Sequence, residues 1–199
     1  KPGEQVWMAL DIAATQLFSK GRYQLALEQR DLSAEAMIDL FTQWTRRYPI
    51  ASIEDPLAED DFPGFVAMSR ALGHSLQIVG DDFLVTHTQR LREAASQGAA
   101  NAILIKPNQR GTLSEALDAW KTASALGYQG IVSARSGETE DNSIVHLAIG
   151  WQVPQLKVGS FSRGERMVKW NELLRLEDQL GEQAFFAGAR ALSYAGGKR

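Results

Sequence analysis

Charged and hydroxyl side chains gather directly after an apolar run in the second half of the chain. The run Ile131–Ser133 leads into Ala134, Arg135 and Ser136, and three carboxylates follow by Asp141. Arginine suits an anion because its planar guanidinium matches the oxygens of a phosphate or carboxylate two at a time, and hydroxyl and loop N–H groups add donors. The segment therefore predicts an oxyanion site, with a structural turn held by internal salt bridges as the alternative.

Three carboxylates stand at the ends of other apolar runs, at Asp11, Glu54 and Asp81. Oxygen ligands on neighbouring strand ends suit Mg²⁺, which prefers octahedral oxygen coordination and leaves places for water or substrate. We therefore expect these three acids to form a magnesium site. Each acid taken alone is equally typical of a helix cap or a solvated group. The adjacent Asp55 and Asp82 point the other way along a strand and are expected to support or cap the site.

Lysine at the end of an apolar run indicates a second kind of chemistry. Beside bound cations and another lysine, a lysine gives up its proton more easily than in water, so Lys106 is a candidate general base. Lys157 either acts in the same way or stays charged and holds a substrate carboxylate. A purely structural pairing of each lysine with a strand-end carboxylate is the alternative.

These residues lie at the ends of six apolar runs that alternate with helix-like patterns, which favours parallel strands joined by crossover helices. The runs cover residues 6–11, 49–56, 76–82, 101–106, 130–135 and 155–159. Charged residues at successive strand ends converge in a TIM-type (β/α) barrel, where the carboxyl edge of the strands is the catalytic face. An open, doubly wound sheet is the alternative, and it would scatter the same residues along an edge.

A complete barrel has eight strands and about 250 residues, whereas this chain has 199 residues and six βα units. Because the first residue is Lys1 rather than methionine, we expect residues 1–199 to be the later part of a barrel whose first two strands precede Lys1. Unpaired sheet edges in such a piece would promote association.

Local signals mark the connecting segments. Ser33 is placed to cap a helix, and Thr112 with Glu115 forms the pattern of a capping box. Residues 21–28 alternate in the manner of an exposed hairpin strand. The chain is expected to fray after Tyr194, where little is left to bury.

The composition is that of an ordinary globular domain, with 44% hydrophobic and 23% charged residues and a net charge of −3. This charge gives no basic field for a nucleic-acid backbone. No apolar run approaches the roughly 20 residues of a membrane span. The absence of cysteine excludes disulfides and thiolate sites and favours a cytoplasmic location. The three histidines are expected to be surface or packing residues, and His87 lies nearest the predicted site.

Several motifs are long enough to identify a family, and together they resemble enolase from about Val6 to Gly181. They are residues 9–14 (ALDIAA), 52–56 (SIEDP), 80–82 (GDD), 105–109 (IKPNQ), 133–141 (SARSGETED), 157–159 (KVG) and 162–166 (SRGER). The resemblance implies the last six βα units of a ββαα(βα)₆ barrel. It also implies a Mg²⁺-dependent lyase of glycolysis that interconverts 2-phosphoglycerate and phosphoenolpyruvate, usually as a homodimer in the cytoplasm, with cell-surface or secreted forms by family analogy.

The resemblance also implies residue roles. Asp11, Glu54 and Asp81 match the ligands of the first magnesium, with Glu54 and Asp81 also facing the substrate. Lys106 matches the base that removes the C2 proton, and Lys157 matches the lysine near the substrate carboxylate. The phosphate loop is matched by Ser133, Ala134, Arg135 and Ser136.

Two departures from the family pattern stand out. Enolases commonly have histidine between the serine and arginine of the phosphate loop, where this chain has Ala134. The N-terminal domain, the loops of the second magnesium and the glutamates that assist loss of the hydroxyl group would all precede Lys1. The isolated piece is therefore expected to be inactive or weakly active.

Two other functions remain open. A divergent enolase paralogue acting on a related phosphonate or carboxyphosphonate would account for Ala134. An enolase-like protein retained for binding, such as the plasminogen or RNA-degradation contacts known among enolases, is opposed by the retained acids and lysines.

Overall fold

The computed structural model describes residues 1–192, and the predicted fraying after Tyr194 concerns residues outside this range. Its main element is a parallel sheet of six strands, as the six apolar runs predict. The strands are β1 (Met8–Asp11), β5 (Ile50–Glu54), β6 (Gln77–Gly80), β7 (Ala102–Ile105), β8 (Gln129–Ser133) and β9 (Gln155–Lys157).

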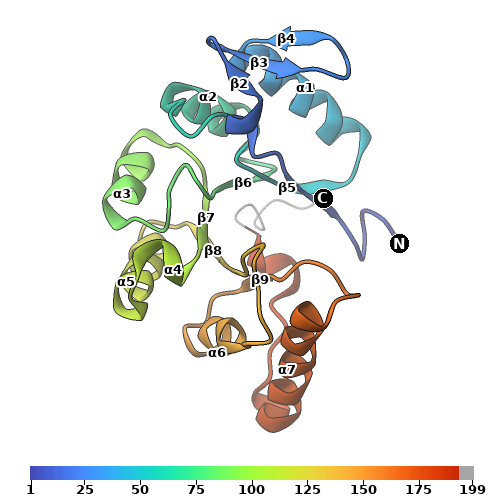
Figure 1. The fold of residues 1–199 in the computed structure, drawn as a ribbon, viewed down its shortest axis with the longest axis vertical. Coiled ribbons are helices and arrows are strands. Elements are labelled where there is room, and N and C mark those ends of the chain that lie inside the picture. The colour runs from blue at the N-terminus through green and yellow to red at the C-terminus, as the bar shows by residue number, and fades with distance from the viewer. Residues whose placement is uncertain (193–199) are drawn as a thin grey trace.

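The sheet is a curled half-barrel with its strands in sequential order, β1-β5-β6-β7-β8-β9 (Figure 1). Every neighbouring pair is parallel. In a flat sheet the two edge strands would lie about 24 Å apart, at about 4.8 Å per strand. The side chains of Asp11 on β1 and Lys157 on β9 nevertheless meet at 2.7 Å. The sequential order and the curl confirm the barrel-type fold and exclude the doubly wound alternative.

Helices follow the strands and form an arc outside the curled sheet (Figure 1). They are α1 (Ala34–Arg47), α2 (Phe62–Leu72), α3 (Thr88–Gln97), the short α4 (Pro107–Arg110), α5 (Leu113–Ala125), α6 (Ser143–Gly150) and α7 (Gly164–Leu180). The predicted caps are confirmed, because Ser33 Oγ accepts the N–H of Ala36 and Thr112 Oγ1 accepts the N–H of Glu115. Such caps satisfy N–H groups that have no partner inside the helix.

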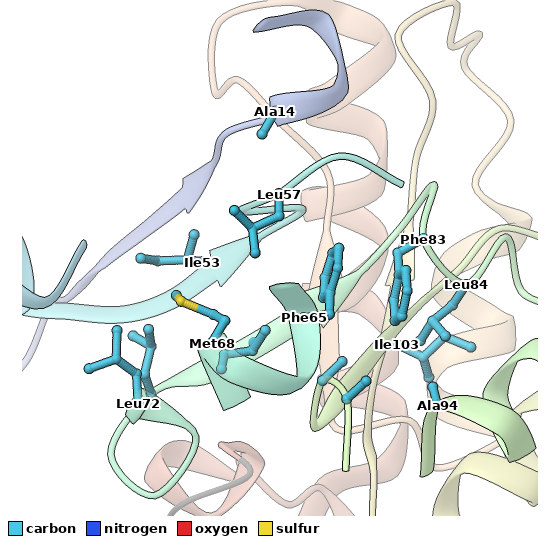
Figure 2. Packing of buried hydrophobic residues seen from close by; sticks show 14 of the residues in the cluster. Ala14, Ile53, Leu57, Phe65, Met68, Leu72, Phe83, Leu84, Ala94 and Ile103 are labelled. Carbon is cyan, nitrogen blue, oxygen red and sulfur yellow. The ribbon is translucent and has the colours of Figure 1, made fainter. Parts of the chain in front are cut away.

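Alternation along each strand separates two apolar clusters. Ile53, Ile78 and Ile103 point outward and belong to the large core beneath the helices, where Phe65 stacks on Phe83 with ring centroids 3.8 Å apart (Figure 2). A smaller cluster on the inner face consists of Val79, Ala102, Leu104 and Ile131. Side chains two residues apart share a face of a strand, so the strand-end residues in phase with this inner cluster point into the mouth of the half-barrel.

A second, antiparallel sheet consists of β2 (Phe18–Ser19), β3 (Arg22–Leu25) and β4 (Arg30–Leu32), next to a 3-10 turn at Ala14–Leu17. The predicted hairpin strand is present as β3, but it is not exposed throughout, because Tyr23 is fully buried. The hairpin contacts α1 and the 3-10 turn. The Tyr23 hydroxyl accepts the N–H of Ala58 and contacts Asp61, so the hairpin is fastened to the loop after β5.

The opposite end of the half-barrel is closed by polar side chains. Gln77 on β6 and Gln155 on β9 exchange hydrogen bonds of 3.0 Å across the interior. Gln155 also donates to the carbonyl of Ala191, at the end of the 3-10 helix Gly188–Ala191. Among residues 1–192, no helix is both long and apolar enough to cross a membrane.

Candidate active site

The three predicted acids lie on neighbouring strands at the carboxyl edge. Asp11 and Glu54 are register partners at the ends of β1 and β5, and Asp81 directly follows β6. Glu54 and Asp81 are buried, whereas the Asp11 side chain is about half exposed at 47%. Strand order and alternation therefore place these three carboxylates at successive strand ends, although their oxygen atoms do not all lie within 4.8 Å of one another.

Lys157 connects two of these acids. Its ammonium donates to Asp11 Oδ2 at 2.7 Å and to both carboxylate oxygens of Glu54 at 2.8 Å. Burial alone would lower the pKa of Lys157, but the charges and hydrogen bonds of Glu54 and Asp11 outweigh burial, so the pKa is raised above its ordinary value. A raised pKa keeps Lys157 in its charged form, which favours the anion-holding role over the role of a base.

Glu54 is buried beside two other carboxylates and one lysine. Burial raises the pKa of Glu54 to about 7, and the neighbouring charges of Asp11 and Asp81 add to the rise, although Lys157 lowers it. A carboxyl group with a raised pKa beside other acids is typical of a site that binds a cation, because the cation would stabilise the ionised form.

Asp81 and Lys106 form a second ion pair, and a closed set of hydrogen bonds surrounds it. The Lys106 ammonium donates to Asp81 Oδ2, and the Lys106 backbone N–H donates to Thr86 Oγ1 at 3.0 Å. The Thr86 hydroxyl contacts Gln109 Oε1 at 2.9 Å, and Gln109 Nε2 donates to Asp81 Oδ1 at 3.4 Å. Both the backbone and the side chain of Lys106 are thus held by one network.

Thr86 and Gln109 were not identified from the sequence. Val85 and Thr86 have left-handed φ angles of 44° and 52°, which are unusual for β-branched residues and cluster at functional sites. Nothing in a sequence pattern signals such a backbone. Gln109 does belong to the IKPNQ motif, so this motif could have indicated that Gln109 is part of the site.

Another acidic group shares Asp81 with the predicted triad. Oxygen atoms of Asp55, Asp81 and Asp82 lie within 4.8 Å of one another. Asp55 accepts the N–H groups of Asp81 and Asp82 at 2.9 and 2.8 Å, as expected of a capping group, and burial raises its pKa to about 6. The donor chemistry fits Mg²⁺ at this edge, because all the candidate ligands are carboxylate oxygens beside Asp81.

The predicted oxyanion site lies in the loop of residues 134–141 that follows β8, hereafter the anion loop. Ser133 is buried and bonds to the carbonyl of Ala134, while the Ala134 N–H donates to the carbonyl of Lys157 at 2.9 Å. Arg135 and Ser136 are exposed. Among the described residues, the Arg135 guanidinium takes part in no ion pair. The loop thus lies next to Lys157 and presents one uncommitted cation.

The structural alternatives are also visible. Both lysines pair with carboxylates, whereas the loop is held from outside, by a salt bridge between Glu138 and Lys169 of α7 at 2.7 Å. His87 lies outside the site and caps α3, accepting the N–H of Gln89 on Nδ1.

Comparison with known protein families matches residues 2–195 to the family described as "Enolase, C-terminal TIM barrel domain".

Proposed function

Because the chain belongs to the family of enolase C-terminal TIM barrel domains, we propose that the protein containing it catalyses the reversible dehydration of 2-phosphoglycerate to phosphoenolpyruvate. The observation that supports this proposal most is the convergence of Lys106 and Lys157 with Asp11, Glu54 and Asp81 at one strand edge. Two ion-paired groups lie at this edge, Lys106 with Asp81 and Lys157 with Asp11 and Glu54, and their amines can hold an anionic substrate and accept a proton from it.

Each residue has a proposed task. Lys106 accepts the proton from C2 as the hydroxyl group leaves C3 as water, and its network with Thr86 and Gln109 holds it in place. Lys157 holds the substrate carboxylate. In the anion loop, Arg135 binds the phosphate with the help of Ser136.

Asp11, Glu54 and Asp81 would hold Mg²⁺, in line with the raised pKa of the buried Glu54 beside the other two carboxylates. When bound, the cation supplies positive charge beside the substrate carboxylate and thereby makes the C2 proton more acidic. Asp55 fixes the loop that carries Asp81 through two N–H bonds. No residue of this chain is assigned to the departure of the hydroxyl group.

Ala134 favours a second candidate, a related phosphonate or carboxyphosphonate as substrate. The residue is buried next to Lys157, at a place where its methyl group offers no hydrogen bond. A missing charge-assisted contact corresponds to about 1.5–3 kcal/mol, or roughly 10- to 100-fold in rate.

The test is steady-state conversion of 2-phosphoglycerate by the full-length protein with Mg²⁺, compared with its Ala134→His and Lys106→Met variants. We expect turnover in the unmodified protein, a rise of roughly 10-fold or more in Ala134→His, and loss of turnover in Lys106→Met. No turnover in either the unmodified protein or Ala134→His would reject this substrate and bring the phosphonate forward.

A further inference from the structure

The beginning of α7 carries two buried cations. Arg166 is 5% exposed and Lys169 is fully buried, at positions one helical turn apart. An unpaired buried charge is strongly unfavourable, so the partners of these two side chains show what their burial serves. Apart from one carbonyl of α7 itself, all of these partners lie in the anion loop or in the residue after Lys157.

Lys169 reaches the backbone of Arg135 through a carboxylate. Its ammonium forms an ion pair with Glu138 Oε2 at 2.7 Å and donates hydrogen bonds to the carbonyls of Thr139 at 2.9 Å and Glu165 at 2.8 Å. The other oxygen of Glu138 accepts the backbone N–H of Arg135 at 2.7 Å. Lys169 therefore orients a carboxylate that in turn holds the backbone of the exposed arginine.

Arg166 joins the same loop to the end of β9. One guanidinium nitrogen donates to the carbonyl of Ser136 at 3.1 Å, and another donates to the carbonyl of Val158 at 2.9 Å. Ser136 is next to Arg135 in the chain, and Val158 is next to Lys157. A single planar group thus fixes the separation between the two segments that carry the candidate anion-binding side chains.

We propose that Lys169 and Arg166 are positioning residues that preorganise the anion loop: Lys169 sets the backbone of Arg135 through Glu138, and Arg166 sets the spacing between this loop and Lys157. The identity of the bound anion as the phosphate of 2-phosphoglycerate rests on the proposed function, but the preorganisation itself does not. Preorganised donors bind an anion more tightly because no loop ordering accompanies binding.

The experiment measures binding of inorganic phosphate by the full-length protein, by three single variants and by the Lys169→Met/Glu138→Gln double variant. Lys169→Met removes the charge at similar length, and Glu138→Gln keeps an acceptor for Arg135 while weakening the tie to Lys169. Arg175→Met is the matched control, since it removes an exposed cation from the same helix, whose ion-pair partner within residues 1–192 is Glu172 alone. Phosphate affinity, exchange of the Arg135 amide hydrogen, the KM and kcat for 2-phosphoglycerate, and the unfolding temperature are recorded.

We expect phosphate affinity to fall about 10-fold or more in Lys169→Met and less in Glu138→Gln, with faster exchange at Arg135 and a parallel rise in KM. The double variant should be no worse than Lys169→Met, because both changes act through one contact. Arg175→Met should stay within about twofold of the unmodified protein.

A merely structural role would lower the unfolding temperature and leave phosphate affinity and KM unchanged, which would overturn the proposal. Absence of phosphate binding by the unmodified protein would overturn it as well. Where phosphate affinity depends on Lys169 but 2-phosphoglycerate is not converted, the positioning role stands and the proposed reaction fails. Because Glu138→Gln is a mild change, it provides the same comparison if Lys169→Met does not fold.

Discussion

Titration of Glu54 should make the stability of the metal-free protein fall as pH rises. The pKa of Glu54 is raised from 4.5 to about 7 by burial. In the native state Glu54 therefore keeps its proton at pH values where the unfolded chain has lost it, and this stabilisation is fully present below pH 4.5 and lost as pH rises through about 7. The full shift corresponds to about 3 kcal/mol.

The window from pH 6 to pH 8 is the most informative part of this titration. There the unfolded Glu54 is ionised throughout, so the native group alone should lower the free energy of unfolding by about 1.4 kcal/mol. Asp55, with a pKa raised to about 6, contributes mainly below this window. The assay is urea unfolding at constant ionic strength in a chelating buffer, at pH 6, 7 and 8.

Addition of Mg²⁺ and the Glu54→Gln variant show whether Glu54 causes the pH dependence of stability. Saturating Mg²⁺ should stabilise the protein more at pH 8 than at pH 6, because the cation binds the ionised carboxylates and protons compete with it. Glu54→Gln should lose the slope between pH 6 and pH 8 and most of the response to Mg²⁺. An equal slope in Glu54→Gln, or stabilisation by Mg²⁺ that does not depend on pH, would refute this account of the site.

Two further predictions concern the scaffold. Gly159, directly after Val158, has a φ of +108°, and an added Cβ would have no atom of a non-adjacent residue within 3.5 Å, so Gly159→Ala should cost about 1–3 kcal/mol through backbone strain alone. Thermal unfolding measures this cost, with Gly137→Ala as the control, because Gly137 has open space and no positive φ. Equal loss of stability in the two variants would contradict the prediction. Tyr23→Phe removes the acceptor of the buried Ala58 N–H and should lower the free energy of unfolding, measured in urea, by about 1–3 kcal/mol. A decrease below about 0.5 kcal/mol would show that this hydrogen bond does not fasten the hairpin.

The sequence by itself determined which residues face the candidate site. Strand alternation has a period of two, and helix caps use neighbours three residues apart, so both signals are local. The ends of the six apolar runs therefore placed Asp11, Glu54, Lys106 and Lys157 at one edge, and the helix cap by Thr112 was confirmed.

Whether a side chain of the hairpin is buried depends on which other elements pack against the hairpin. An alternating strand shows which residues share a face, but not whether another element covers that face. The 3-10 turn and α1 cover the face that carries Tyr23, so a residue expected to be exposed is fully buried.

Only the tertiary structure decided how the site residues pair. The contact between Lys157 and Asp11 spans 146 residues and joins the two edge strands, and it exists because the sheet curls. The burial of Glu54 between Asp11, Asp81 and Lys157 and the link from Lys169 to Arg135 through Glu138 likewise arise between separate elements. Local patterns determine where a side chain points, whereas its partner depends on register, curl and helix docking, which the whole chain sets together.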